Sequence, residues 1–232
     1  MVTTNNFQLF FDFSNIKNHY SIKDIIISDF NKEVYQYLFE LNNWQSQFLF
    51  IYGNKGVGKT LLSKIYIQNK SGIHISLSDL TDISKIDYIL QTYKNIAIDN
   101  ITTLTKEQEI ILIHLYNSTQ GLKEHNLIFI SRKAPNQFVF NTNDLKSRFF
   151  SMISLQITEP SDDVLKALFI KNLTDKQFVI TKSILDLIFT HSKRDCQTLI
   201  DLANKIDNFL ATNNKKLTIS IIKDIINSMN YL

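Results

Sequence analysis

Cysteine, long apolar runs and targeting segments are scarce or absent in this sequence, and each shortage narrows the class of protein. Cys196 is the only cysteine among 232 residues, so no disulfide can form within the chain. Lysine, aspartate or asparagine interrupts every apolar run before it reaches the length of a membrane span. Residues 1–6 lack the basic start and apolar core of a signal peptide. We therefore expect a cytoplasmic protein without a membrane partner.

An excess of one charge is also missing. Lysine and arginine together number 25 against 22 acidic residues, which gives a net charge of +3, and the lysines are scattered along the chain. Such a mild charge does not predict strong non-specific binding to DNA, so we expect any contact with DNA to be indirect. Hydrophobic residues make up 44% of the chain, enough for one large domain or for a large and a small one.

Glycine is rare, but three of the five glycines fall within residues 53–60, which read G-x-x-x-x-G-K-T. Glycines let a loop fold tightly enough for its N–H groups to point at phosphates, and the helix that follows adds the positive end of its dipole. The apolar run 48–52 precedes this loop, as a buried parallel strand would. The sequence therefore predicts a phosphate-binding P-loop for a nucleoside di- or triphosphate, formed by Gly53, Asn54, Lys55, Gly56, Val57, Gly58, Lys59, Thr60 and Leu61. Within it, we expect Lys59 to contact the β- and γ-phosphates and the Thr60 hydroxyl to bind Mg²⁺.

Short apolar runs alternate with amphipathic segments up to Pro160, a pattern typical of an α/β domain with a parallel sheet. The predicted strands are 48–52, 73–77, 95–98, 127–130 and 152–157, and the predicted helices are 31–41, 59–69, 84–92 and 107–120. After Pro160 the pattern predicts helices only, at 162–172, 183–189, 194–209 and 219–226. We expect an N-terminal tail (1–18), a nucleotide-binding αβα domain (19–158) and a small all-helical lid domain (159–232), the layout of AAA+ ATPases.

A second nucleotide motif follows the P-loop by about 40 residues. The apolar strand 95–98 ends in Asp99, which predicts a Walker B acid that binds Mg²⁺ opposite Thr60. The next residue is Asn100, whose amide cannot accept a proton from an attacking water, so we expect little autonomous hydrolysis. Ser131 ends the strand 127–130, where a polar side chain would sense the γ-phosphate.

Arginine occurs at only three positions, Arg132, Arg148 and Arg194. An arginine provides a rigid fork that lysine does not. Arg148 is a candidate arginine finger for a neighbour's nucleotide, and Arg194 a candidate sensor for the chain's own nucleotide. The alternative is that both form surface ion pairs, for example with Asp144 and Asp195.

Several segments resemble the DnaA family of bacterial replication initiators. Residues 145–149 (L-K-S-R-F) are similar to that family's arginine-finger motif, residues 20–31 to its N-terminal segment beside the adenine pocket, and residues 114–117 and 193–195 to two further motifs. The resemblance implies that ATP or ADP is the nucleotide, with adenine held by Ile26, Ile27 and Asn31. It also implies that Arg148 acts in trans, that Arg194 is the sensor, and that AAA+ interfaces allow a homo-oligomer.

Residues 8–13 (Q-L-F-F-D-F) are similar to peptides that dock into the bacterial sliding clamp, with Gln8, Leu9, Phe11 and Phe13 as the anchors. A clamp peptide followed by a DnaA-like module, without a DNA-binding domain, resembles the Hda group, the regulatory inactivators of DnaA. This resemblance implies a negative regulator of replication initiation that binds DnaA and the clamp and stimulates hydrolysis of DnaA-bound ATP. Two alternatives stay open: an autonomous ATPase of the helicase-loader or clamp-loader type, and a non-enzymatic adaptor between clamp and DnaA.

Overall fold

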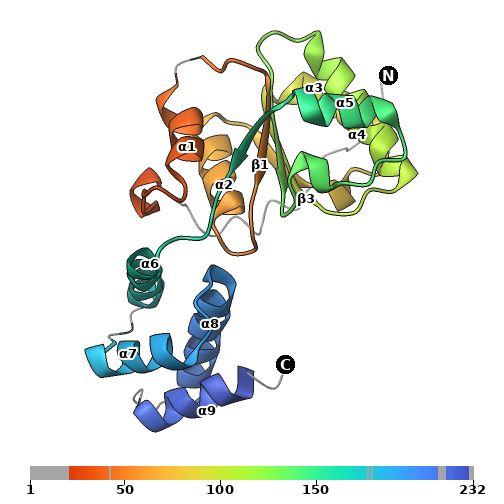
Figure 1. Cartoon of the computed structure of the whole chain (residues 1–232). Helices are drawn as coiled ribbons and strands as arrows, with labels where there is room; N and C mark the ends of the chain where they lie inside the picture. Colours follow the sequence, from red (N-terminus) through yellow and green to blue (C-terminus); the bar gives the residue numbers. More distant parts are fainter. Residues whose placement is uncertain (1–20, 42, 177, 179, 214–217, 230–232) are drawn as a thin grey trace, which may run out of the picture.

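Five parallel strands of the described residues form one sheet, which lies in the upper part of the computed structural model as drawn in Figure 1. The structure describes residues 21–41, 43–176, 178, 180–213 and 218–229. The strand order is β2-β3-β4-β1-β5, so the strand before the P-loop lies between β4 and β5. The strands are β1 (Phe48–Tyr52), β2 (Ile73–Ser76), β3 (Asn95–Ile101), β4 (Asn126–Ser131) and β5 (Ile153–Gln156). All five predicted strands are therefore present.

Successive side chains of β1 point alternately into two hydrophobic clusters, one on each face of the sheet. Leu49 and Ile51 pack with residues of α1 (Lys32–Tyr35) and α2 (Lys59–Asn69). Phe48 and Phe50 pack on the opposite face, with residues of α3 (Ile83–Thr92), α4 (Lys106–Gln120) and α5 (Asn143–Ser151). Because successive side chains of a strand point to opposite faces, both faces are apolar and both are covered by helices (Figure 1).

Two helical segments of this part differ from the prediction. The segment predicted as one helix over 31–41 is a short α1 that continues as a π-helical turn, η4 (Gln36–Glu40). Helix α5 is not predicted by the sequence at all. It starts at the side chain of Thr142, which accepts a hydrogen bond from the N–H of Leu145, and it buries Leu145 and Phe149, four residues apart. Short 3₁₀ turns connect other elements: η3 (Ile22–Asp24), η5 (Leu77–Asp79) and η6 (Pro135–Gln137).

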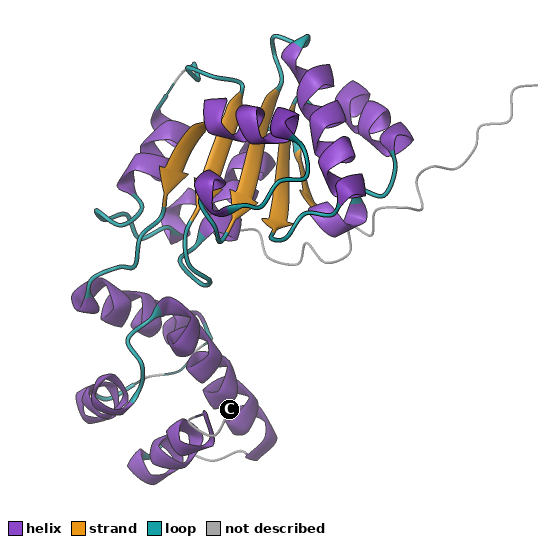
Figure 2. Cartoon of the chain, turned by 45° about the vertical axis from the view of Figure 1, so that its right-hand side comes forward, coloured by secondary structure: helices purple, strands orange, loops and turns teal. Residues whose placement is uncertain are grey.

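Only helices follow β5 in the described part of the chain, as predicted (Figure 2). They are α6 (Asp162–Asp175), α7 (Lys182–His191), α8 (Cys196–Asn213) and α9 (Ile219–Met229). Their apolar faces pack together and join the core beneath α1 and α2. Arg194 does not open α8 as expected, because the side chain of Asp195 caps that helix by accepting from the N–H of Thr198 at 2.8 Å. The domain boundaries at residues 18/19 and 158/159 stay predictions.

In the described part of the chain, no helix combines the length and the apolar character needed to cross a bilayer.

Candidate nucleotide-binding site

The P-loop connects β1 to α2, and its three glycines all have positive φ angles, of 149° (Gly53), 87° (Gly56) and 98° (Gly58). These angles explain why glycine is needed here, since other residues rarely adopt them. The Lys59 ammonium donates to the carbonyl oxygens of Gly53 at 2.8 Å and Asn54 at 2.6 Å. Burial of this ammonium lowers the pKa of Lys59, and the nearby Asp99 carboxylate opposes that effect. The lysine is thus held at the centre of the loop.

Thr60 and Asp99 meet at the carboxyl edge of the sheet. The Thr60 hydroxyl donates to Asp99 Oδ2 at 2.6 Å, although the two residues are 39 apart in sequence. A hydroxyl and a buried carboxylate at this distance are oxygen ligands of the kind Mg²⁺ takes, with phosphate and water oxygens completing its shell. The pair therefore fits a Mg²⁺ ion bound together with a nucleotide.

Asn100 occupies a kink in β3 immediately after this acid. Its φ is +60°, and the pairing of β3 with β4 shifts register between Ile98 and Ile101. Its N–H donates to Asp99 Oδ1 at 2.6 Å, and its side chain is exposed. The kink orients the Asp99 carboxylate and leaves an amide at the mouth of the site.

His74 is a site residue that sequence reasoning missed. Its Nε2 lies 3.5 Å from Asp99 Oδ2 and 3.1 Å from the Ser63 hydroxyl. Burial lowers the pKa of His74 to about 4, although the Asp99 carboxylate opposes the shift, so the ring is neutral near pH 7. The signal in the sequence was a polar residue inside the alternating strand I-H-I-S, but only the pairing of β2 with β3 brings it to Asp99.

A cavity of about 390 Å³ with a positive lining lies beside the P-loop. Lys59 and Thr60 line it together with Asp99, and three further cations contribute: Lys55, Lys64 and Arg132. No role for Arg132 is predicted from the sequence. Leu61, Gly56, Gly58 and Ser131 also line this cavity.

The hydroxyl of Ser131, predicted to sense the γ-phosphate, already forms hydrogen bonds within the chain. Its buried hydroxyl donates to the carbonyl of Ile101 at 2.7 Å and accepts from the N–H of Lys133 at 3.0 Å. These bonds join the ends of β3 and β4 and shape the turn that carries Arg132. Ser131 therefore lies at the expected place, with its hydroxyl already bonded to the backbone.

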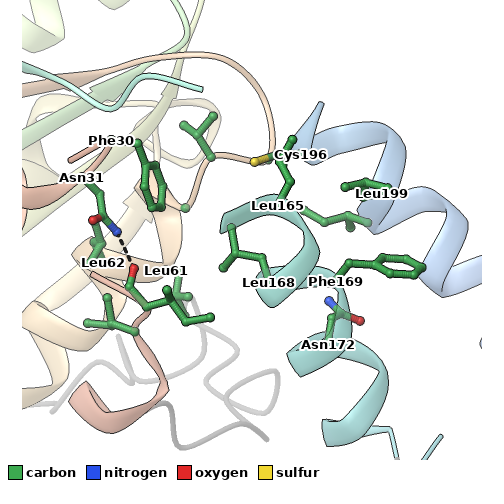
Figure 3. A pocket seen from close by; sticks show the side chains of 16 residues that line it. Phe30, Asn31, Leu61, Leu62, Leu165, Leu168, Phe169, Asn172, Cys196 and Leu199 are labelled. Carbon is green, nitrogen blue, oxygen red and sulfur yellow. Dashed lines mark hydrogen bonds between the residues drawn. The ribbon is translucent and has the colours of Figure 1, made fainter. Parts of the chain in front are cut away.

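A second, apolar cavity of about 190 Å³ adjoins the P-loop (Figure 3). Ile26 and Asn31 line it as expected, and Phe30 adds an aromatic wall. Ile27 is not among the residues that line it, and 45% of Ile27 is exposed. The Asn31 amide is bonded within its own segment, accepting from the Ser28 N–H and donating to the Ile26 carbonyl, both at 3.0 Å.

The far wall of this apolar cavity comes from α6 and α8 (Figure 3). Seven residues of these helices line it: Leu165, Leu168, Phe169, Asn172, Cys196, Leu199 and Ile200. Burial is the largest cause that raises the pKa of Cys196 to about 12. Sequence reasoning missed this wall, because its members look like ordinary core positions of two helices until the helices are placed against the P-loop.

Arg194 does not reach either cavity. Its Nη1 lies 2.6 Å from Asp162 Oδ2 and its Nε donates to the Phe189 carbonyl, while 56% of the side chain is exposed. The ion pair that the sequence suggested as an alternative is thus formed, with Asp162 in place of Asp195. A role as nucleotide sensor stays a prediction.

Arg148 lies on α5, away from both cavities, and is held by its own chain. Its guanidinium lies 4.9 Å above the ring centroid of Tyr116, and its Nη2 is 2.9 Å from Asp144 Oδ1. Its Nε is buried and finds no hydrogen-bond partner among the described residues. The predicted alternative pair with Asp144 is therefore present. The clamp-peptide residues Gln8, Leu9, Phe11 and Phe13 lie outside the described residues.

Known proteins share this fold. No protein-family model matches the chain. The chromosomal replication initiator protein DnaA of Borreliella burgdorferi is 24% identical over 233 residues, a match that covers 91% of this chain and 48% of that protein. The chain thus spans about half the length of the DnaA relatives it matches.

Two solved structures are similar to this chain over most of its length. Domain III of DnaA from Thermotoga maritima is 18% identical, with a TM-score of 0.73, over 89% of this chain and 95% of that one. AMPPCP-bound DnaA from Aquifex aeolicus is 21% identical, with a TM-score of 0.68, over 84% of this chain and 66% of that one. The chain therefore shares the fold of DnaA domain III, a five-stranded parallel sheet with helices followed by a helical segment, which confirms the fold class expected from the sequence.

Proposed function

We propose that this chain is an AAA+ regulator of replication initiation that binds ATP or ADP with Mg²⁺. The hydrogen bond between Thr60 and Asp99 carries the nucleotide assignment, because it joins the P-loop after β1 to the acid of β3, on the far side of β4, at 2.6 Å. The phosphates would lie in the cationic cavity and the base in the apolar one, and the P-loop residues Gly56, Gly58 and Leu61 line both. Adenine is supported by the relative from Aquifex aeolicus, which is described with the ATP analogue AMPPCP.

The proposed action on a partner depends on Arg148. In the DnaA family, to which the motif L-K-S-R-F is similar, this arginine serves the nucleotide of a neighbouring subunit. Here Arg148 would leave Asp144 and contact the γ-phosphate of ATP bound to DnaA, and an arginine supplied in trans can raise hydrolysis about 10³–10⁵-fold. Residues 8–13 would tether the chain to the sliding clamp, a proposal that rests on the sequence alone.

The test is release of ADP from DnaA loaded with radiolabelled ATP, in the presence of this protein and clamp on DNA. We expect Arg148→Ala to abolish the stimulation, and a Gln8→Ala/Leu9→Ala double variant to abolish it as well. Lys146→Ala is the matched control, because Lys146 is an exposed cation on the same helix and lacks the contacts of Arg148 with Tyr116 and Asp144. Full stimulation by Arg148→Ala would refute the finger.

The two alternatives make different predictions in the same assay. An autonomous ATPase hydrolyses ATP without DnaA, and the exposed amide of Asn100 speaks against it, since an amide accepts no proton from water. A non-enzymatic adaptor binds both DnaA and clamp yet leaves the rate of ADP release unchanged. Nucleotide binding itself is tested separately by calorimetric titration of ADP into the wild type and Lys59→Ala.

A further inference from the structure

The apolar cavity is lined by two asparagine side chains, and the side-chain oxygen of only one of them accepts a hydrogen bond from a described residue. Asn31 uses its carbonyl oxygen and its amino group on the backbone of residues 26–28, which fixes the segment that forms one wall. Asn172 projects from α6 on the opposite wall, at the end of the cavity beyond Leu168 (Figure 3). Its Oδ1 is buried and has no hydrogen-bond donor among the residues that the structure describes.

An unpaired buried acceptor is unfavourable, because it has lost its water and gained no partner. Such a group is tolerated where a ligand supplies the missing donor. Of the described residues, the neighbouring lining residues Leu165, Leu168 and Phe169 are apolar, so their side chains supply no donor. The terminal torsion of asparagine is broad and two-fold, so the amide can turn its oxygen toward the cavity at little cost.

We propose that Asn172 reads the base of the bound nucleotide, by accepting a hydrogen bond from the exocyclic amino group of adenine. The inference rests on the proposed nucleotide-binding function and adds a residue that sets base specificity. Asparagine pairs well with adenine because the amide offers one acceptor and one donor to the 6-amino group and an adjacent ring nitrogen. A purine without the amino group leaves Oδ1 unpaired in the cavity, and a buried polar group left unpaired is what rejects such an analogue.

The experiment compares ADP with purine riboside diphosphate, which carries hydrogen in place of the 6-amino group. Binding of each to the full chain is measured by calorimetry with Mg²⁺, for the wild type and three variants. Asn172→Leu keeps the size of the side chain and removes the acceptor, whereas Asn172→Asp keeps an acceptor. Asn208→Leu is the matched control, an exposed asparagine on α8 outside the cavity. Thermal unfolding of each variant establishes that it is folded.

We expect the wild type, Asn172→Asp and Asn208→Leu to prefer ADP by about tenfold or more. We expect Asn172→Leu to bind the two nucleotides with equal affinity. An equal preference in the wild type and Asn172→Leu overturns the inference, as does loss of the preference in Asn172→Asp. Nucleotide binding without base preference in the wild type overturns this inference alone, while no binding of either nucleotide overturns the proposed function with it.

Discussion

Replacement of Gly56 by alanine tests how closely the helical part of the chain approaches the P-loop. Gly56 has a φ of +87°, and a Cβ added there would lie 2.8 Å from the backbone nitrogen of Gln197 and 3.1 Å from the carbonyl carbon of Cys196. The left-handed backbone costs alanine about 1–2 kcal/mol. Because the obstructing atoms are backbone at the start of α8, that helix must shift, which adds about 1–3 kcal/mol. We expect Gly56→Ala to lower the free energy of unfolding by about 2–5 kcal/mol.

Two other glycines separate the contributions to this loss. Gly58 has a φ of +98° but open space around its Cβ position, so Gly58→Ala should show the backbone cost alone, about 1–2 kcal/mol. Gly121, at the end of α4, has a φ of −76° and no atom within 3.8 Å of that position, so Gly121→Ala should be neutral or stabilising by up to about 1 kcal/mol. Urea unfolding measures all three variants. If Gly56→Ala costs no more than Gly58→Ala, the close approach of α8 to the P-loop is refuted.

Three further predictions follow from buried polar groups. Burial raises the pKa of the Cys196 thiol to about 12, so little of the reactive thiolate is present at pH 8 in the folded chain. The thiol should therefore react with a disulfide reagent about a thousandfold more slowly in the folded chain than in urea. Equal rates would contradict its burial. Burial lowers the pKa of His74 to about 4 in the folded chain, below its value in the unfolded chain. At a pH between these two pKa values, the folded chain therefore binds fewer protons than the unfolded chain. Its stability should therefore fall by about 2 kcal/mol from pH 7 to pH 5 in EDTA, a slope that His74→Gln should lose in urea titrations. Glu109 is fully buried and accepts four hydrogen bonds from Asn141 and Thr142. Glu109→Gln replaces one accepting oxygen by an NH₂ group that faces other donors, so it should lower the free energy of unfolding by about 1–3 kcal/mol. A loss within error would show that the loop rearranges.

The strands and the P-loop are predictable from the sequence because their signals are local. A run such as 48–52 is apolar at every position since β1 is covered on both faces, and the glycines of the P-loop are needed by their own backbone angles. Helix α5 was missed because only Leu145 and Phe149 of its nine residues are buried, so its apolar pattern is too short to recognise.

The parts of the site that the sequence did not reveal depend on distant segments. His74 reaches Asp99 only through the pairing of two strands, and Asn172 reaches the cavity only through the placement of α6 against the P-loop. Neither residue stands in a motif, and an asparagine within a helix ordinarily faces solvent. The positions of both side chains depend on tertiary packing, which a single sequence does not specify residue by residue.

The contacts of Arg148 bear on whether its side chain can serve a partner. Its ion pair with Asp144 is between neighbours on one helix, and the Asp144 side chain is 51% exposed, so the pair contributes at most about 1 kcal/mol. The stacking on Tyr116 contributes a similar amount, about 0.5–1 kcal/mol. Lysine would lack the planar group that stacks on the ring and the fork that binds two oxygens at once. Leaving both contacts would therefore cost about 2 kcal/mol, and a phosphate offers the same fork more charge than a single carboxylate, so these contacts are compatible with the role in trans that we propose.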